Sequence, residues 1–156
     1  MSASNVTPEQ TQQAIFNIEK LYVKDLSLEI PHAPGIFLER ETPQIDLQLN
    51  TGAMPVEDGV FEVTVTVTVT AKLAEKDKVM FLVEAKQAGI FQVRNIPQDE
   101  IEPVLAVVCP NILYPYLREV VSDVVIRAGF APVMLSPINF DALYQQKKQQ
   151  SPEVTH

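Results

Sequence analysis

The stretch VFEVTVTVTVTAKL, residues 60–73, alternates apolar and polar side chains over almost its whole length. Every odd position from Phe61 to Leu73 is apolar, whereas the even positions between them carry Glu, Thr or Lys. Successive side chains of a strand point to opposite faces, and β-branched residues favour strands. The stretch therefore predicts a β-strand with one buried face and one face in water.

Two further segments extend this strand into a sheet. VMFLVEAKQ, residues 79–87, follows the short charged connection EKDK and predicts an antiparallel hairpin with residues 60–73. QIDLQLN, residues 44–50, alternates as well and begins directly after Pro43. Proline cannot donate to a strand ladder, so we expect this strand at an edge of the sheet.

A fourth strand is predicted at residues 22–30, YVKDLSLEI. Leu26 and Leu28 fall on one of its faces, and Asp25 and Glu29 fall on the other. Carboxylates at this spacing on one strand lie about 13 Å apart, at about 3.3 Å per residue. The strand thus has an apolar face for the core and an acidic face for solvent.

The period becomes helical in the C-terminal part of the chain. Residues 109–128 predict a long helix with Pro110 in its first turn and Gly129 as its stop. Residues 139–148 predict a short helix with Asn139 as its N-cap. The apolar stripe of the long helix comprises Ile112, Leu113, Tyr116, Leu117, Val120, Val121, Val124 and Val125. Strands followed by helices predict an α+β domain, a four-stranded antiparallel sheet backed by one long and one short helix.

Length and composition fit one ordinary globular domain. The chain has 156 residues, of which 46% are hydrophobic and 21% are charged. We expect residues 1–13 to be a disordered leader and residues 145–156 to be a flexible polar tail. The domain itself is then expected over residues 14–144.

Charge and hydropathy narrow the class of partner. The 20 acidic and 12 basic side chains give a formal charge of −8, and an acidic surface repels phosphate backbones and anionic lipids. The first residues lack the apolar core of a signal peptide, and no apolar run approaches the roughly 18 residues that cross a bilayer. Cys109, the single cysteine, permits no intrachain disulfide. We therefore predict a cytoplasmic protein that binds no nucleic acid and does not insert directly into a membrane.

The sequence lacks the motifs of common enzyme classes. Neither a P-loop nor a GxGxxG motif occurs. His32, His156 and Cys109 are too few and too scattered for a zinc site. Cys109 stands at the start of the long helix, so it is either the nucleophile of a small hydrolase or a buried small apolar residue. The second interpretation is favoured, and we predict no enzyme activity, no cofactor and no metal.

Five blocks of the chain, taken in order, carry a family resemblance. They are YVKDLSLEIPHAP at 22–34, VTVTVTAKL at 65–73, EAKQAGIF at 84–91, CPNILYPYLRE at 109–119 and SPINFDALY at 136–144. Together they resemble the SecB family of protein-export chaperones, over most of residues 16–144. The combination of CPNILYPY with PINFDAL is the most specific part of the resemblance.

The resemblance implies a function and an assembly. The function is an ATP-independent molecular chaperone that binds unfolded precursor proteins, keeps them translocation-competent and delivers them to the SecA motor of the Sec pathway. The assembly is a homotetramer, a dimer of dimers in which two sheets join edge to edge and the long helices pack between the dimers. The alternative is a SecB-like chaperone dedicated to a toxin–antitoxin system.

By resemblance, the client-binding groove includes Phe37, Ile45, Leu47 and Leu49. Exposed apolar side chains beside an edge strand suit an unfolded client, which offers apolar side chains and unpaired backbone. The family often has a Trp where this chain has Glu41. That departure removes one aromatic from the expected lining of the groove.

By resemblance, a basic, zinc-bearing C-terminal segment of SecA binds on an acidic outer face of the sheet. The matching positions are Asp25, Glu29, Leu82 and Glu84. Carboxylates around one apolar side chain suit a contact that is steered by charge and anchored by a small apolar residue.

A further set of residues is expected at the oligomer interface. The resemblance assigns tetramer packing to Val83, Ala85 and Gln87, and the width of the helical stripe adds Tyr116, Val120 and Val124.

Overall fold

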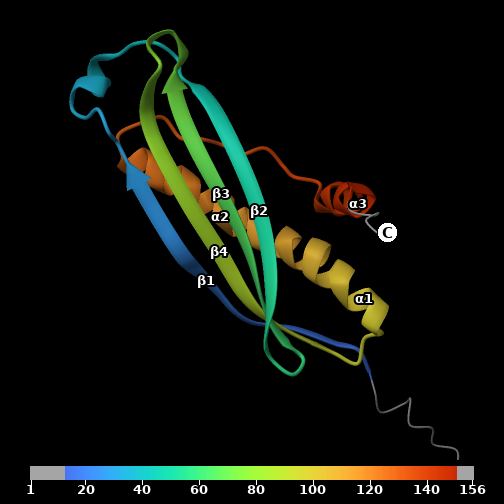
Figure 1. Cartoon of the computed structure of the whole chain (residues 1–156). Coiled ribbons are helices and arrows are strands. Elements are labelled where there is room, and N and C mark those ends of the chain that lie inside the picture. The colour runs from blue at the N-terminus through green and yellow to red at the C-terminus, as the bar shows by residue number, and fades with distance from the viewer. Residues whose placement is uncertain (1–12, 151–156) are drawn as a thin grey trace, which may run out of the picture.

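The computed structural model describes residues 13–150 and contains one antiparallel sheet of four strands. The strands follow the order β1-β4-β3-β2 across the sheet (Figure 1). Their bounds are Ile15–Glu29 for β1, Gln44–Glu57 for β2, Val60–Leu73 for β3 and Lys78–Arg94 for β4. The predicted sheet, its central hairpin and the edge position of β2 are confirmed. The residues expected as a leader lie outside the described part of the chain, apart from Gln13.

Strands β1, β2 and β4 are longer than predicted, whereas β3 has the predicted bounds. The N-terminal part of β1 pairs with the C-terminal part of β4, with Phe16 opposite Val93. Two register shifts interrupt β1, one between Ile18 and Lys20 and one after Val23. Each shift resets the alternation by one residue, so the period-two signal of β1 is broken in the sequence although the strand continues.

The helical part begins upstream of the predicted long helix. Helix α1 (Gln98–Pro103), a π-helical turn (Val104–Val108) and α2 (Cys109–Arg127) follow one another without a break. The N–H of Cys109 donates to the carbonyl of Val104, five residues earlier. Prolines in this segment remove N–H donors from the ordinary ladder, and the π turn is a local adjustment of that ladder.

This continuous helix corrects the expectation that no apolar stretch approaches the length that crosses a bilayer. Residues Gln98–Arg127 contain an 18-residue window that is apolar enough, by length and composition alone, to cross a membrane. The core helix of a globular domain passes the same test. Leu113, Leu117 and Val121 of this helix are fully buried against the sheet, and such packing accounts for its apolar composition.

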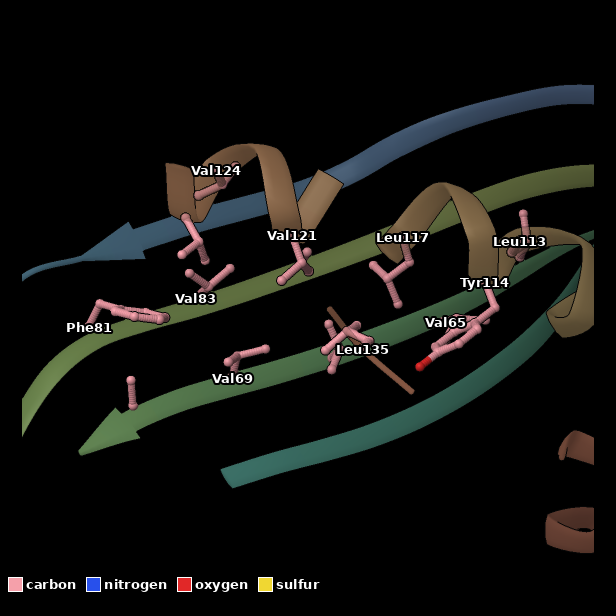
Figure 2. Close-up of a cluster of buried hydrophobic side chains, with 14 of the residues drawn as sticks. Val65, Val69, Phe81, Val83, Leu113, Tyr114, Leu117, Val121, Val124 and Leu135 are labelled. Atoms are coloured by element: carbon pink, nitrogen blue, oxygen red, sulfur yellow. The ribbon is translucent and has the colours of Figure 1, made fainter. Parts of the chain in front are cut away.

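The hydrophobic core lies between α2 and one face of the sheet. Figure 2 shows Leu117 and Val121 of α2 pointing toward Val83 of β4 and Val69 of β3. The apolar side chains of β3 that face α2 are buried, as the alternation predicted. No described helix covers the opposite face of the sheet, which we call the outer face (Figure 1).

The stripe on α2 is narrower than predicted. Tyr114, which the prediction omitted, is buried, and its hydroxyl donates to the carbonyl of Ser136 at 2.6 Å. Tyr116, which the prediction included, is 49% exposed. Ile112 and Val120 are half-buried. The helix therefore has a fully buried centre and a partly exposed apolar margin.

The ends of the helices form as their sequences predict. Gly129 has φ +96°, its N–H donates to Ile126 and the N–H of Phe130 donates to Val125, which is a Schellman motif. Helix α3 (Phe140–Gln150) is capped by Asn139, whose Oδ1 accepts from the N–H of Ala142 at 2.9 Å. Helix α3 thus includes residues 145–150 of the segment that we expected to be a flexible tail, and residues 151–156 of that segment lie outside the described part of the chain.

Candidate client groove and outer sheet face

An apolar groove lies between the edge strand β2 and the connection from α2 to α3. Its volume is about 570 Å³. It brings together Ile45 and Leu47, which are 43% and 45% exposed. The groove is lined by Thr42, Pro43, Ile45, Leu47, Met80, Phe81, Phe130, Ala131, Pro132, Val133, Met134, Leu135 and Ser136.

Aromatic rings close one end of this groove. Phe37 stacks on Phe130 with ring centroids 5.1 Å apart, and Phe130 packs on Phe81 with centroids 4.9 Å apart. Phe37 follows Ile36, which is buried and anchors the short helical turn Gly35–Leu38. The structure therefore places Phe37 beside the groove, in contact with one of its lining residues.

Leu49 does not line the same cavity. It is half-buried and borders a smaller cavity of about 120 Å³ beside α3. Phe140 and Leu143 of α3 line that cavity too. Of the four residues predicted for the groove, Ile45 and Leu47 therefore line the larger cavity, Leu49 borders the smaller one, and Phe37 lies beside the larger one.

Sequence reasoning missed the far wall of the groove. Phe130, Val133 and Met134 lie in a connection without regular secondary structure. Such a segment has no periodicity, so no helix or strand pattern indicated its place in the fold. The available signal was compositional, since an apolar run without a helical or strand period marks a segment that is held by tertiary packing.

Glu41 stands beside the groove, where the family often has an aromatic. Among the described residues, its buried Oε1 has no hydrogen-bond partner. Burial, followed by the nearby carboxyl group of Glu75, raises the pKa of Glu41. Its neighbour Glu39 is ion-paired with Lys76 at 2.5 Å. This segment is thus held against the β3–β4 turn by charged groups.

The structure brings the four predicted SecA positions together on the outer face. Glu29 lies directly opposite Leu82 in the β1–β4 ladder, and Ser27 lies opposite Glu84. Asp25, on the same face of β1, is exposed like Glu29 and Glu84. Leu82 is half-buried, with Glu29 opposite it and Glu84 two residues along the same strand. Asp25 lies beyond Glu84, opposite Lys86, so the arrangement is a row of three carboxylates with an apolar side chain at one end.

The outer face also carries cations, which the sequence interpretation did not include. Lys86 lies opposite Asp25, and both border a polar trough of about 470 Å³ with Glu84. Lys24 is ion-paired with Glu62 at 2.8 Å. The carboxylates Asp25, Glu29 and Glu84 therefore share this face with basic side chains.

Three residues predicted for the oligomer interface are covered within the chain. Val83, Ala85 and Gln87 are buried on the face of β4 that packs against α2. They cannot contact another subunit directly while α2 covers them. Any effect on assembly has to act through the position of α2, where Tyr116 and Val120 reach the surface and Val124 is 9% exposed.

The edge of β1 offers a second apolar surface. In the described part of the chain, no strand pairs with β1 on the side away from β4. Its helix-side residues include Ile18, Val23, Leu26 and Leu28, all of them exposed. An unpaired strand edge with an apolar face is suited to pairing with another strand.

Cys109 does not have the surroundings of a nucleophile. Its side chain is fully buried. Burial raises the pKa of its thiol to about 12, so almost no thiolate forms at neutral pH. The hydrolase interpretation therefore has no reactive group at this position. Within residues 13–150, no group of three or more His, Cys, Asp or Glu side chains is arranged to hold a metal.

A family model described as "Preprotein translocase subunit SecB" matches residues 9–151. The chain belongs to the SecB family. SecB proteins are protein-export chaperones and not enzymes, as the sequence predicted.

Curated SecB relatives match over nearly their full lengths. The protein-export protein SecB of Nitrosomonas eutropha is 67% identical over 92% of this chain and 89% of its own. The SecB of Dechloromonas aromatica is 61% identical over 91% of this chain and 92% of its own. The SecB of Chromobacterium violaceum is 59% identical over 95% of this chain and 97% of its own.

A solved structure shares the fold at low sequence identity. It is a SecB-like chaperone of Mycobacterium tuberculosis in complex with a peptide from the HigA1 antitoxin. The TM-score is 0.64 at 17% identity, over 79% of this chain and 90% of that chain. The likeness supports the α+β arrangement of the SecB family.

Proposed function

We propose that this SecB-family chain is a cytoplasmic, ATP-independent chaperone that holds unfolded precursors in the groove beside β2 and delivers them to SecA at the outer face. The observation that carries the proposal is the groove itself. Ile45 and Leu47 of the edge strand remain nearly half exposed, whereas Ala71 and Val69, which lie opposite them in β3, are fully buried. Exposed apolar side chains next to a strand edge are what an unfolded chain can bind.

The energetics of holding a client favour several linked sites. Each well-buried client side chain contributes about 1.5–3 kcal/mol, so about five anchors give roughly 7–15 kcal/mol. Ordering a disordered segment costs about 2–5 kcal/mol or more. Because about 8 kcal/mol corresponds to micromolar binding, a single groove holds a client only loosely. Linked grooves raise the overall affinity by about 10²–10⁴.

Assembly as a dimer of dimers would link the grooves. The unpaired edge of β1 and its exposed apolar row support pairing between two sheets. The exposed margin of α2, which includes Tyr116, supports packing between two dimers. Sedimentation or light scattering should give a tetramer, and a monomer at micromolar concentration would contradict this assembly.

The outer face supports contact with a basic segment of SecA. Asp25, Glu84 and Glu29 form a row that ends at Leu82, without another described element above them. A toxin–antitoxin specialist does not need such a face, so this arrangement favours general export over that alternative. The test is a titration of the chain with SecA and with its isolated C-terminal segment. We expect binding that weakens with salt and is lost in Asp25→Ala combined with Glu84→Ala. Undiminished affinity in that variant would remove the assignment.

The groove is tested separately. Leu47→Asn should weaken the capture of a chemically unfolded client, measured as the delay of its refolding. Val56→Asn is the matched control, because Val56 is exposed on the same strand but does not line the groove. Equal delay of refolding by Leu47→Asn and the wild-type chain would place client binding elsewhere.

A further inference from the structure

A buried carboxylate on the outer face connects two strands that are not neighbours. Glu62 of β3 is 8% exposed. Its Oε2 accepts from the hydroxyl of Tyr22 at 2.5 Å, and both of its oxygens accept from Nζ of Lys24 at 2.8 and 2.9 Å. Tyr22 and Lys24 belong to β1, so these bonds cross β4, the strand between β1 and β3. They cross it near Ala88, which lies opposite Tyr22 and is fully buried.

Lys24 occupies a β-bulge. In the β1–β4 ladder, Val23 lies opposite Gln87 and Asp25 lies opposite Lys86. Lys24 is therefore the extra residue, with no β4 partner of its own in the described sheet. The two residues of β1 at this bulge share one residue of β4.

The position of this bulge decides the face on which the acidic residues lie. Without the extra residue, Lys24 would face Lys86, and Asp25 would lie opposite Ala85 on the side of α2. A shift of one residue moves every following side chain of a strand to the other face. The same shift would carry Glu29 away from Leu82. The presentation of Asp25 and Glu29 to solvent thus depends on the bulge at Lys24.

Glu62 is the group that holds Lys24 in this position. Lys24 lacks a ladder partner, whereas Glu62 is fixed on the central strand β3. The hydrogen bond from Lys24 and then that from Tyr22 lower the pKa of Glu62, so it is ionised at neutral pH. Charge-assisted hydrogen bonds of this kind are stronger than neutral ones. Within the described sheet, β1 is paired along one side only, so a restraint from β3 is significant for its register.

We propose that Glu62, Tyr22 and Lys24 are positioning residues for the partner-binding carboxylates of the outer face. This inference rests on the proposed function of that face as the site of a basic partner segment. Lys24 contributes through its position in the bulge, and its charge is compensated by Glu62. Glu62 fixes that position from β3, and Tyr22, two residues before Lys24 in β1, fixes it through its own hydrogen bond to Glu62.

Lys24→Met separates positioning from simple charge. If Lys24 acted only as a cation near Asp25, its removal would strengthen the binding of a basic segment. A positioning role predicts the opposite, because the bulge loses its anchor. Lys20→Met is the matched control: Lys20 is exposed on the same face of β1 and, in the described chain, forms no ion pair. We expect its removal to leave the affinity unchanged or increased.

The experiment measures the affinity of the full-length variants for the basic C-terminal segment of SecA. Lys24→Met and Glu62→Gln should each weaken binding by about fivefold or more, as expected for residues coupled in one network. Tyr22→Phe, which removes only the hydroxyl, should weaken it less. Capture of an unfolded client should be unchanged, because the groove lies on the other side of the sheet.

Two outcomes overturn the proposal or its premise separately. If Asp25→Ala with Glu84→Ala weakens binding and Lys24→Met does not, the positioning role is wrong. If the double variant itself leaves binding intact, the proposed face is wrong. Amide hydrogen exchange along Asp25–Glu29 tests positioning without any partner. It should accelerate in Lys24→Met and Glu62→Gln but not in Lys20→Met, and unchanged exchange would overturn the role of the network.

Discussion

Phe37 and Phe130 stack with ring centroids 5.1 Å apart, although one precedes the sheet's edge strand and the other follows the long helix. The contact joins the two segments that flank the apolar groove. Aromatic pairs of this kind contribute about 0.5–1.5 kcal/mol beyond the burial of their area. The stacked pair therefore helps to fix the width of the groove at this end.

Phe37→Ala should weaken client capture and also lower the stability of the fold by a similar, modest amount. Because Phe37 is 47% exposed, we expect the free energy of unfolding to fall by about 1 kcal/mol and client affinity to fall about three- to tenfold. Leu38→Ala is the control, since Leu38 is 82% exposed in the same helical turn. Denaturant unfolding and refolding delay provide the two readouts. Equal client affinity in both variants would show that Phe37 takes no part in the groove.

The parts of the fold that sequence could predict are those in which local pattern and tertiary packing agree. Strand β3 was predicted from Val60 to Leu73, because its strict alternation matches a sheet covered on one face. The caps at Gly129 and Asn139 were predicted as well, since they depend on nearby backbone groups. In each case the chemistry is contained within a few residues.

The parts that sequence could not predict depend on contacts between distant segments. The bulge at Lys24 is stabilised by Glu62, which alternation alone assigned to a solvated face. The groove wall at Phe130 follows from packing on Phe81 and Phe37. The family resemblance led us to expect Asp25, Glu29, Leu82 and Glu84 on one face, whereas the position of Lys86 opposite Asp25 became apparent only from the register.

Glu41, which stands beside the groove, makes the stability of the folded chain depend on pH. Its pKa is raised, mainly by burial and then by the nearby carboxyl group of Glu75. A carboxyl whose pKa is raised in the folded state stabilises that state below its ordinary value of 4.5, and this contribution is lost as the pH rises through the folded pKa. At neutral pH the ionised group is therefore a net cost to folding.

Glu41→Gln should accordingly raise the melting temperature at neutral pH, and the gain should shrink below pH 4.5. Glu57→Gln is the control, because Glu57 is exposed near the end of β2. Thermal unfolding monitored by circular dichroism across this range provides the measurement. A gain of the same size at acidic and neutral pH would show that charge on Glu41 is not its cause.

Tyr22 should titrate far above an ordinary tyrosine. Burial, followed by the hydrogen bond to Glu62, raises the pKa of Tyr22 to about 12. The stabilisation from the neutral phenol is then complete below the ordinary value of 10.0 and is lost as the pH rises through about 12. The tyrosinate absorbance of the wild-type chain minus that of Tyr22→Phe isolates this one group. We expect its midpoint near pH 12 and a shift toward 10.0 in Glu62→Gln, while a midpoint near 10.0 in the wild-type chain would exclude the buried hydrogen bond.

Gly129 connects the stop of α2 to the same aromatic pair. Its φ of +96° lies in a region that disfavours residues with a Cβ, and a Cβ built there would lie 3.1 Å from Cε1 of Phe37. Gly129→Ala should therefore lower the free energy of unfolding by about 1–2 kcal/mol from backbone strain, with a further loss from crowding of the ring. Gly35→Ala is the matched control, because a Cβ at Gly35 meets no described atom within 4 Å.

A double variant separates the two causes. In a Phe37→Ala background the crowding disappears but the backbone strain remains, so Gly129→Ala should cost less there than in the wild-type chain. The difference between the two losses of unfolding free energy, measured by denaturant unfolding, is the contribution of crowding against the Phe37 ring. If Gly129→Ala lowers the free energy of unfolding equally in both backgrounds, the Phe37 ring moves aside without a measurable cost. The end of α2 is then determined by its Schellman motif alone.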